Sequence, residues 1–136
     1  MRKYLPIYFI MLSVLLTYCE IENKTDCRNA ICTMEFRSIN IQIRKTPDNT
    51  PVILTSYKVL RTSDNKDITI RDNGLSDNNG YYPIVNDNSE GLTINGDTEV
   101  EFQGFINNTM AVSRKIIVSR DCCHVSYVSG DTIAYI

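Results

Sequence analysis

The sequence has no tryptophan and a single histidine among its 136 residues, so one residue type that recurs in ligand-binding platforms is absent and one that recurs in acid–base catalysis is scarce. Its basic residues do not cluster, and 16 acidic side chains face 14 basic ones. This mildly acidic balance argues against nucleic acid as a partner and against electrostatic binding to a membrane surface. No apolar run reaches the roughly 20 residues of a membrane-spanning helix.

Motifs for catalysis or for cofactor binding are also missing. We find no phosphate-binding loop, no metal-ligand cluster and no Ser-His-Asp set in a recognisable frame. His124 follows Cys123, but neighbouring side chains on a strand point to opposite faces, so these two cannot form a nucleophile–base pair. We therefore expect His124 at a surface or edge position, and we expect no catalytic residue, no metal site and no cofactor.

Loops rich in Asp and Asn leave calcium binding as an alternative, because oxygen ligands suit this ion. The candidates are Asp72, Asp77, Asn79 and Asp87. They do not follow the EF-hand spacing, and turn formation explains them without an ion. Tyr81 and Tyr82 leave an exposed aromatic platform as a further alternative. One ring facing the core and the other facing solvent is the simpler interpretation.

What is present begins with an export signal. Arg2 and Lys3 precede an uncharged, largely apolar stretch at residues 4–16, and polar residues follow Cys19. A basic start, a short apolar run and a processing site are typical of secreted proteins. The stretch is shorter than a spanning helix requires.

Leu16-Thr17-Tyr18-Cys19 resembles the lipobox of bacterial lipoproteins, although that family prefers a small residue where this chain has Tyr18. The resemblance implies cleavage before Cys19 and acylation of its sulfur, which would anchor the chain in a lipid bilayer. Each buried methylene of an acyl chain contributes about 0.8 kcal/mol. Ordinary secretion, with cleavage after Cys19, and an uncleaved signal anchor are the alternatives.

Four cysteines follow Cys19 and predict two disulfides in an exported domain: Cys27, Cys32, Cys122 and Cys123. The adjacent pair is the poorest match, because consecutive Cα atoms lie about 3.8 Å apart, below the usual disulfide span. We expect two long-range bridges between residues 27–32 and 122–123. Free, buried thiols are the alternative.

The body of the chain shows a hydrophobic period of two. Ile39, Ile41 and Ile43 alternate with polar residues, which is typical of a half-buried strand. Pro83 indicates an edge strand and Gly104 a bulge. Outside the leader we find no helical period. Further strands are expected at residues 52–61, 67–71, 81–85, 92–94, 98–105, 110–118, 123–128 and 132–136.

Short strands at spacings of about ten residues predict an all-β fold, an antiparallel β-sandwich. Immunoglobulin-like topology is the first choice and a transthyretin-like sandwich the second. In an immunoglobulin-like sandwich the first strand, which we expect Cys32 to open, and the last strand, which we expect Cys123 to open, can lie side by side and parallel. This pairing would bring the two cysteines together. The chain then divides into a signal-peptide helix at residues 1–18, a lipidated tether at 19–31 and the sandwich at 32–136.

This layout resembles small cell-envelope lipoproteins of Bacteroidota, in which a lipobox and a polar tether precede one immunoglobulin-like domain. The segment Asp121-Cys122-Cys123-His124-Val125, at the start of the last strand, adds to the resemblance. It implies the bacterial outer membrane as location, on either face. We expect a non-enzymatic binding or interaction module whose loops recognise a protein or glycan partner. The alternative is a structural or assembly subunit, like a fimbrial component, that pairs through its edge strands.

Overall fold

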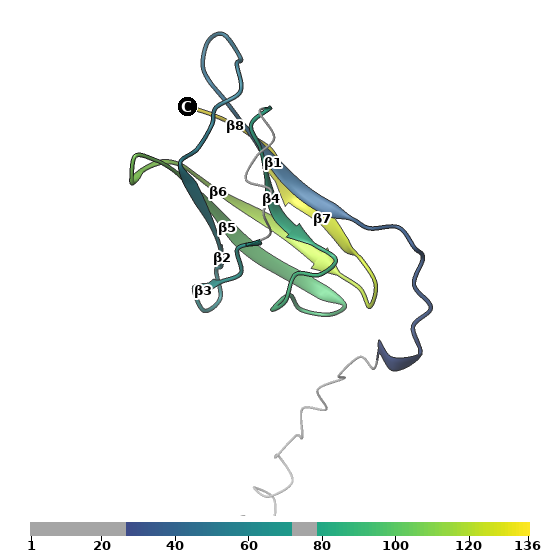
Figure 1. Ribbon diagram of the computed structural model, residues 1–136. Helices are drawn as coiled ribbons and strands as arrows, with labels where there is room; N and C mark the ends of the chain where they lie inside the picture. The colour runs from purple at the N-terminus through teal and green to yellow at the C-terminus, as the bar shows by residue number, and fades with distance from the viewer. Residues whose placement is uncertain (1–26, 72–78) are drawn as a thin grey trace, which may run out of the picture.

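Strands account for nearly all of the regular structure in the computed structural model, which describes residues 27–71 and 79–136 (Figure 1). One short 3-10 turn, η1 (Cys27–Asn29), precedes them. Within these ranges no helix has the length and apolar character needed to cross a membrane. The expected signal helix and the first part of the tether lie outside the described residues. The strands are β1 (Ser38–Arg44), β2 (Ser56–Arg61), β3 (Lys66–Asp67), β4 (Tyr81–Asn86), β5 (Gly96–Ile106), β6 (Thr109–Arg120), β7 (Val125–Gly130) and β8 (Ile133–Tyr135).

The smaller sheet has the order β4-β1-β8. The alternating isoleucines of β1 are buried, as the sequence predicts, and form the centre of the core. β1 pairs antiparallel with β4 and parallel with β8. The edge position of the strand that contains Pro83 is confirmed. The expected parallel pairing is made by β8, beyond Gly130, whereas β7, the strand that follows Cys123, lies in the other sheet.

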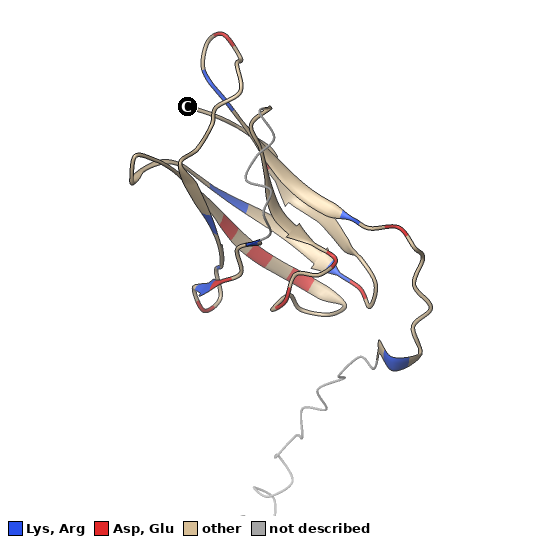
Figure 2. Ribbon diagram, viewed as in Figure 1, with Lys and Arg blue, Asp and Glu red and all other residues tan. Residues whose placement is uncertain are grey.

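The larger sheet has the order β3-β2-β5-β6-β7 and faces the smaller one, which makes a β-sandwich. Asn107 and Asn108 close its long β5–β6 hairpin with positive φ angles of 49° and 64°, as a two-residue turn requires. The predicted bulge is present between Gly104 and Phe105. Acidic residues mark the solvent face of β5 (Figure 2).

The last two strands connect the sheets. β7 belongs to the larger sheet and β8 to the smaller one, and the chain crosses between them at Gly130 with a φ of +113°. A Cβ at this position would lie 2.7 Å from the Lys115 carbonyl oxygen. Only glycine therefore fits the crossover.

Aromatic rings fill the space between the sheets. Tyr57, Tyr82 and Phe102 have centroids 5.6–6.0 Å apart. The buried Tyr82 hydroxyl donates to the Val52 carbonyl at 2.9 Å and accepts from the Leu54 N–H at 2.6 Å. Tyr81 is exposed, so the prediction of one tyrosine inside and one outside is confirmed.

Several predicted strands are shorter than expected. Residues 52–55 precede β2 because Val52 bonds to β1 and Leu54 to Tyr82, across the sandwich. The strand expected at residues 67–71 ends at Asp67, because the Thr69 side chain, in place of a backbone group, accepts the Val59 N–H. The strand expected at 92–94 contributes only one isolated bridge, made by Ile94.

Candidate functional site

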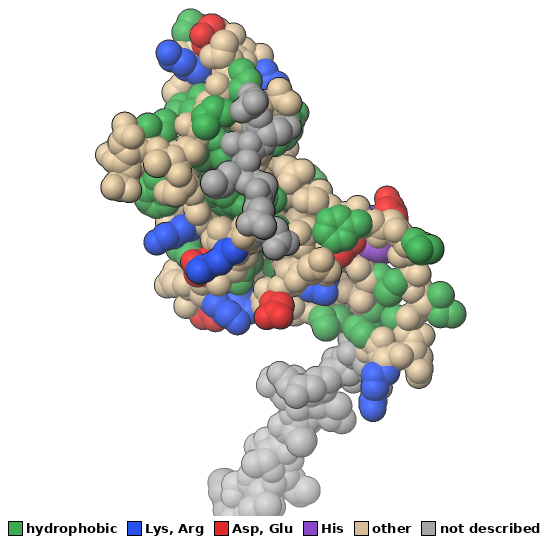
Figure 3. All heavy atoms as spheres, in the orientation of Figure 1, with side chains coloured by type: hydrophobic (Ala, Val, Ile, Leu, Met, Phe, Trp, Pro, Cys, Tyr) green, Lys and Arg blue, Asp and Glu red, His purple; other side chains and the backbone are tan. Residues whose placement is uncertain are grey.

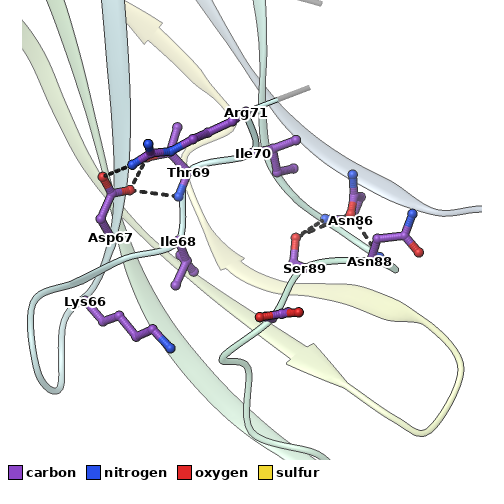
Figure 4. Close-up of a pocket in the computed structure, with 10 residues that line it drawn as sticks. Lys66, Asp67, Ile68, Thr69, Ile70, Arg71, Asn86, Asn88 and Ser89 are labelled. Atoms are coloured by element: carbon purple, nitrogen blue, oxygen red, sulfur yellow. Dashed lines mark hydrogen bonds and ion pairs between the residues drawn. The ribbon is translucent and has the colours of Figure 1, made fainter. Parts of the chain in front are cut away.

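A polar hollow of about 300 Å³ opens between residues 66–71 and residues 86–90 (Figure 4). The first segment follows the β2–β3 turn, and the second follows β4. The hollow therefore lies where an outer strand of each sheet ends. Loops held by a rigid sandwich at such a position are well placed to recognise a ligand.

The first wall is fixed by side chains that replace strand pairing. Asp67 accepts hydrogen bonds from the Thr69 N–H at 2.9 Å and from its hydroxyl at 2.5 Å. These bonds lower the pKa of Asp67, so its carboxylate stays charged. The Tyr57 hydroxyl donates to the Ile70 carbonyl at 3.1 Å. The segment is thus held against β2 by side-chain hydrogen bonds along its length.

The second wall is a compact turn. The Asn86 N–H donates to the Ser89 hydroxyl at 2.8 Å, and the Asn88 N–H donates to the Asn86 amide oxygen at 2.9 Å. Ser89 is buried, whereas Asn88 and Glu90 are exposed. Internal hydrogen bonds thus keep this wall in one shape and leave the outer side chains toward solvent.

Two arginines of the larger sheet hold the second wall in place. Arg61 of β2 donates to the Gly91 carbonyl, and the same guanidinium pairs with Asp64 at 2.8 and 2.5 Å. This pairing lowers the pKa of Asp64 to about 2. Arg120 of β6 donates to the carbonyls of Ser89 and of Asp87, the latter at 3.1 Å. The hollow is therefore largely formed before any ligand arrives.

The lining can make several kinds of polar contact. Lys66 and Arg71 supply positive charge, while Asp67 and Glu90 supply negative charge. Asn88 adds an amide that both donates and accepts. Because both signs are present, the hollow suits a polar ligand with hydroxyl or amide groups better than a strongly charged one.

Residues 27–37, here called the arm, lead into the sandwich at one end. A second cluster of polar side chains lies at this end. His124 is 8% exposed, and its Nδ1 lies 2.9 Å from Asp87 Oδ2. Its Nε2 lies 2.8 Å from the Thr33 hydroxyl. The expectation of a surface histidine is wrong, because the arm folds over the β6–β7 turn and covers the ring.

Hydroxyl, imidazole and carboxylate stand here in the order found in hydrolase triads. The carboxylate of Asp87, however, also accepts the backbone N–H groups of Arg37 and Val125, each at 2.8 Å. Burial acts to raise the pKa of Asp87, but His124 and these two N–H groups together hold it below its ordinary value. One side chain thus joins the arm, β4 and β7, and we interpret the cluster as a structural clamp.

Both disulfides lie beside this clamp. Cys27 is bonded to Cys122, and Cys32 to Cys123. The expected bridges between residues 27–32 and 122–123 are present, and the structure supplies the pairing. The expectation that Cys32 and Cys123 open strands is wrong: Cys32 belongs to the arm, ahead of β1, and Cys123 to the turn before β7. Because its sulfur is bonded, Cys123 has no thiol to share with His124.

The calcium candidates do not come together in the described residues. Asp72 and Asp77 lie outside them. Asp87 is surrounded by hydrogen-bond donors, which is unsuitable for a cation. No group of three or more His, Cys, Asp or Glu in the described part of the chain is arranged to hold a metal.

Comparison with protein-family models, curated proteins and solved structures finds no match to this chain. The case for a binding site therefore rests on the geometry of the hollow alone.

Proposed function

We propose that the protein is a lipid-anchored, non-enzymatic module of the bacterial cell envelope that binds a polar ligand in the hollow between residues 66–71 and 86–90. The observation that carries this proposal is that both walls are fixed by hydrogen bonds to the sandwich. A site formed in advance loses less conformational entropy on binding. Protein and glycan partners both offer the hydroxyl and amide groups that the lining suits.

Binding is expected to depend on two charged residues of opposite sign, one from each wall of the hollow. Once an array of glycans and peptides has given a ligand, Lys66→Ala and Glu90→Ala should each weaken it about tenfold, the effect of losing one charged hydrogen bond. Isothermal titration calorimetry measures the change. Lys115→Ala is the matched control, because Lys115 is exposed on β6 and pairs with Glu99 away from the hollow. An array without hits, or equal losses in all three variants, would count against the binding proposal.

Anchoring rests on the lipobox-like segment that ends at Cys19. We expect the mature protein to begin at Cys19 and to carry acyl chains, so its intact mass exceeds that of the bare chain. Cys19→Ala should remove this mass and release the protein from the membrane fraction. Replacement of another cysteine, such as Cys27→Ala, is not a suitable control because it breaks a disulfide. The control is the wild-type protein treated with lipase, which removes acyl chains without changing the sequence. An unmodified N-terminus would contradict the anchor and leave the binding measurement unaffected.

An assembly subunit is a second candidate function, favoured by the outer strand of the larger sheet. β7 ends that sheet, and its residues 127–130 are exposed. An exposed outer strand can pair with a segment from another chain. Size-exclusion chromatography over a range of concentrations separates the two functions, because an assembly subunit should form larger species as the concentration rises.

A further inference from the structure

Three large apolar side chains project from the arm into solvent. Ile31 is 98% exposed, Met34 is fully exposed and Phe36 is 59% exposed. Scattered apolar residues are normal on a protein surface, but three so close together in the chain form a patch that calls for a partner. Figure 3 shows apolar side chains gathered on the projection beside the purple histidine. We call Ile31, Met34 and Phe36 the arm patch.

The arm is held rigidly, so this exposure is not that of a loose terminus. Cys32, between Ile31 and Met34, is bonded to Cys123. Thr33 contacts His124 at 2.8 Å, and the Arg37 N–H donates to Asp87 at 2.8 Å. Each apolar residue of the patch is therefore next to, or within two positions of, a residue that is bonded to the sandwich. The patch is held in a fixed position on the surface, exposed to solvent.

We propose that the arm patch inserts into the lipid bilayer to which the protein is anchored, and so orients the sandwich on the membrane. This inference rests on the anchor of the proposed function. Cys19 and Cys27 are eight residues apart, and an extended chain spans at most about 3.5 Å per residue, or about 28 Å in all. Because Cys27 is bonded to Cys122, an acylated Cys19 keeps this end of the sandwich close to the lipid.

Insertion of the patch has a geometric consequence. Apolar side chains at a membrane surface reach about 5–10 Å into the boundary between headgroups and acyl chains. The turn between β5 and β6 lies at the other end of the sandwich from the arm (Figure 1). Its residues should therefore stay in water while those of the arm patch enter the lipid.

The absence of tryptophan makes this difference directly measurable. Phe36→Trp places a single reporter in the arm patch of the full-length protein, and Met110→Trp places a matched one, half exposed, beside the β5–β6 turn. Each variant is purified from membranes and reconstituted in vesicles of phosphatidylethanolamine and phosphatidylglycerol with brominated acyl chains. We expect a blue-shifted emission and strong quenching at position 36, and neither at position 110. Adding Ile31→Ser and Met34→Ser to Phe36→Trp should reduce the quenching severalfold.

Flotation of the vesicles separates failure of the anchor from failure of the docking. If the protein floats but the reporters at positions 36 and 110 are quenched alike, the docking is wrong and the anchor stands. If the protein does not float, the anchor is wrong. The tryptophan emission of both variants is then measured after vesicles are added to the soluble protein. A shift of the Phe36→Trp reporter alone then supports docking, and no shift overturns it. Shielding of that reporter from iodide without vesicles would mean that a second copy or another part of the chain covers the patch, which also overturns the proposal.

Discussion

Replacing all four body cysteines by serine is expected to lower the free energy of unfolding by about 7 kcal/mol, most of the stability of an ordinary domain. The reason is the length of the loops. The two bridges join residues 95 and 91 positions apart, and closing a loop of this length in the unfolded chain corresponds to about 4.5 kcal/mol. The replaced cysteines are Cys27, Cys32, Cys122 and Cys123.

The free energy lost on removing one bridge depends on whether the other bridge is present. With either bridge intact, the other closes only the small ring formed by residues 27–32 and 122–123. Such a ring corresponds to about 2.5 kcal/mol. The double variants Cys27→Ser/Cys122→Ser and Cys32→Ser/Cys123→Ser should therefore each cost about this amount. The fourfold variant should cost about 7 kcal/mol, which is about 2 kcal/mol more than the two double variants together.

Urea unfolding, followed by circular dichroism, measures these differences. Wild-type protein in reducing agent should match the fourfold variant. Cys19→Ser is the control, because that cysteine belongs to neither bridge, and it should unfold at the wild-type urea concentration. The result to the contrary would be a fourfold variant whose loss of unfolding free energy equals the sum of the losses in the two double variants. The bridges would then act independently, which would contradict this account.

Asp87→Ala is expected to destabilise the protein by about 3 kcal/mol, although Asp87 lies outside the main apolar core. Its carboxylate is 10% exposed and receives bonds from His124, Arg37 and Val125. Truncation leaves the donors of His124 and Val125, both buried, without an acceptor, which costs more than the bonds themselves contribute. Asp87→Asn keeps the volume and one acceptor oxygen, so a smaller loss is expected.

The pH dependence of this effect follows from the lowered pKa of Asp87. A carboxyl group whose pKa is lower in the folded than in the unfolded state stabilises the fold above its unfolded value of about 3.9. That contribution disappears as the pH falls through the lower, folded value. The stability difference between wild type and Asp87→Asn should therefore shrink as the pH falls below about 4.

Urea unfolding at a series of pH values tests this prediction. Asp64→Asn is a suitable control, since Asp64 also has a lowered pKa but belongs to the exposed turn before β3, where an ion pair contributes little to stability. A difference between wild type and Asp87→Asn that stays constant down to about pH 2 would show that the charge of Asp87 does not stabilise the fold.

Local pattern was enough to predict much of the fold. The alternation of Ile39, Ile41 and Ile43 indicates which face of β1 is buried, because side chains on a strand alternate strictly. Asn107 and Asn108 indicate the β5–β6 turn, since they tolerate positive φ. Pro83 indicates an edge strand. Each of these signals depends only on residues close together in the sequence.

The clamp and the hollow were not predictable in the same way. His124 is separated from Asp87 by 37 positions and from Thr33 by 91, so no spacing along the chain reveals that they meet. The hollow was not predicted, for a related reason. The pattern predicts a continuing strand at residues 67–71, whereas Thr69 replaces strand pairing with a side-chain hydrogen bond. A lone histidine next to paired cysteines was the one available signal for the clamp.

By itself the sequence determined the class of fold and the need for two long-range disulfides, because hydrophobic period and covalent geometry act locally. The proposal of a lipid anchor likewise depends on sequence alone, on Cys19 and the residues before it. Only the tertiary structure decided which cysteines pair, that His124 is buried, and that the arm patch remains outside the core. These outcomes depend on how the arm folds over the β6–β7 turn, and that packing joins residues far apart in the chain.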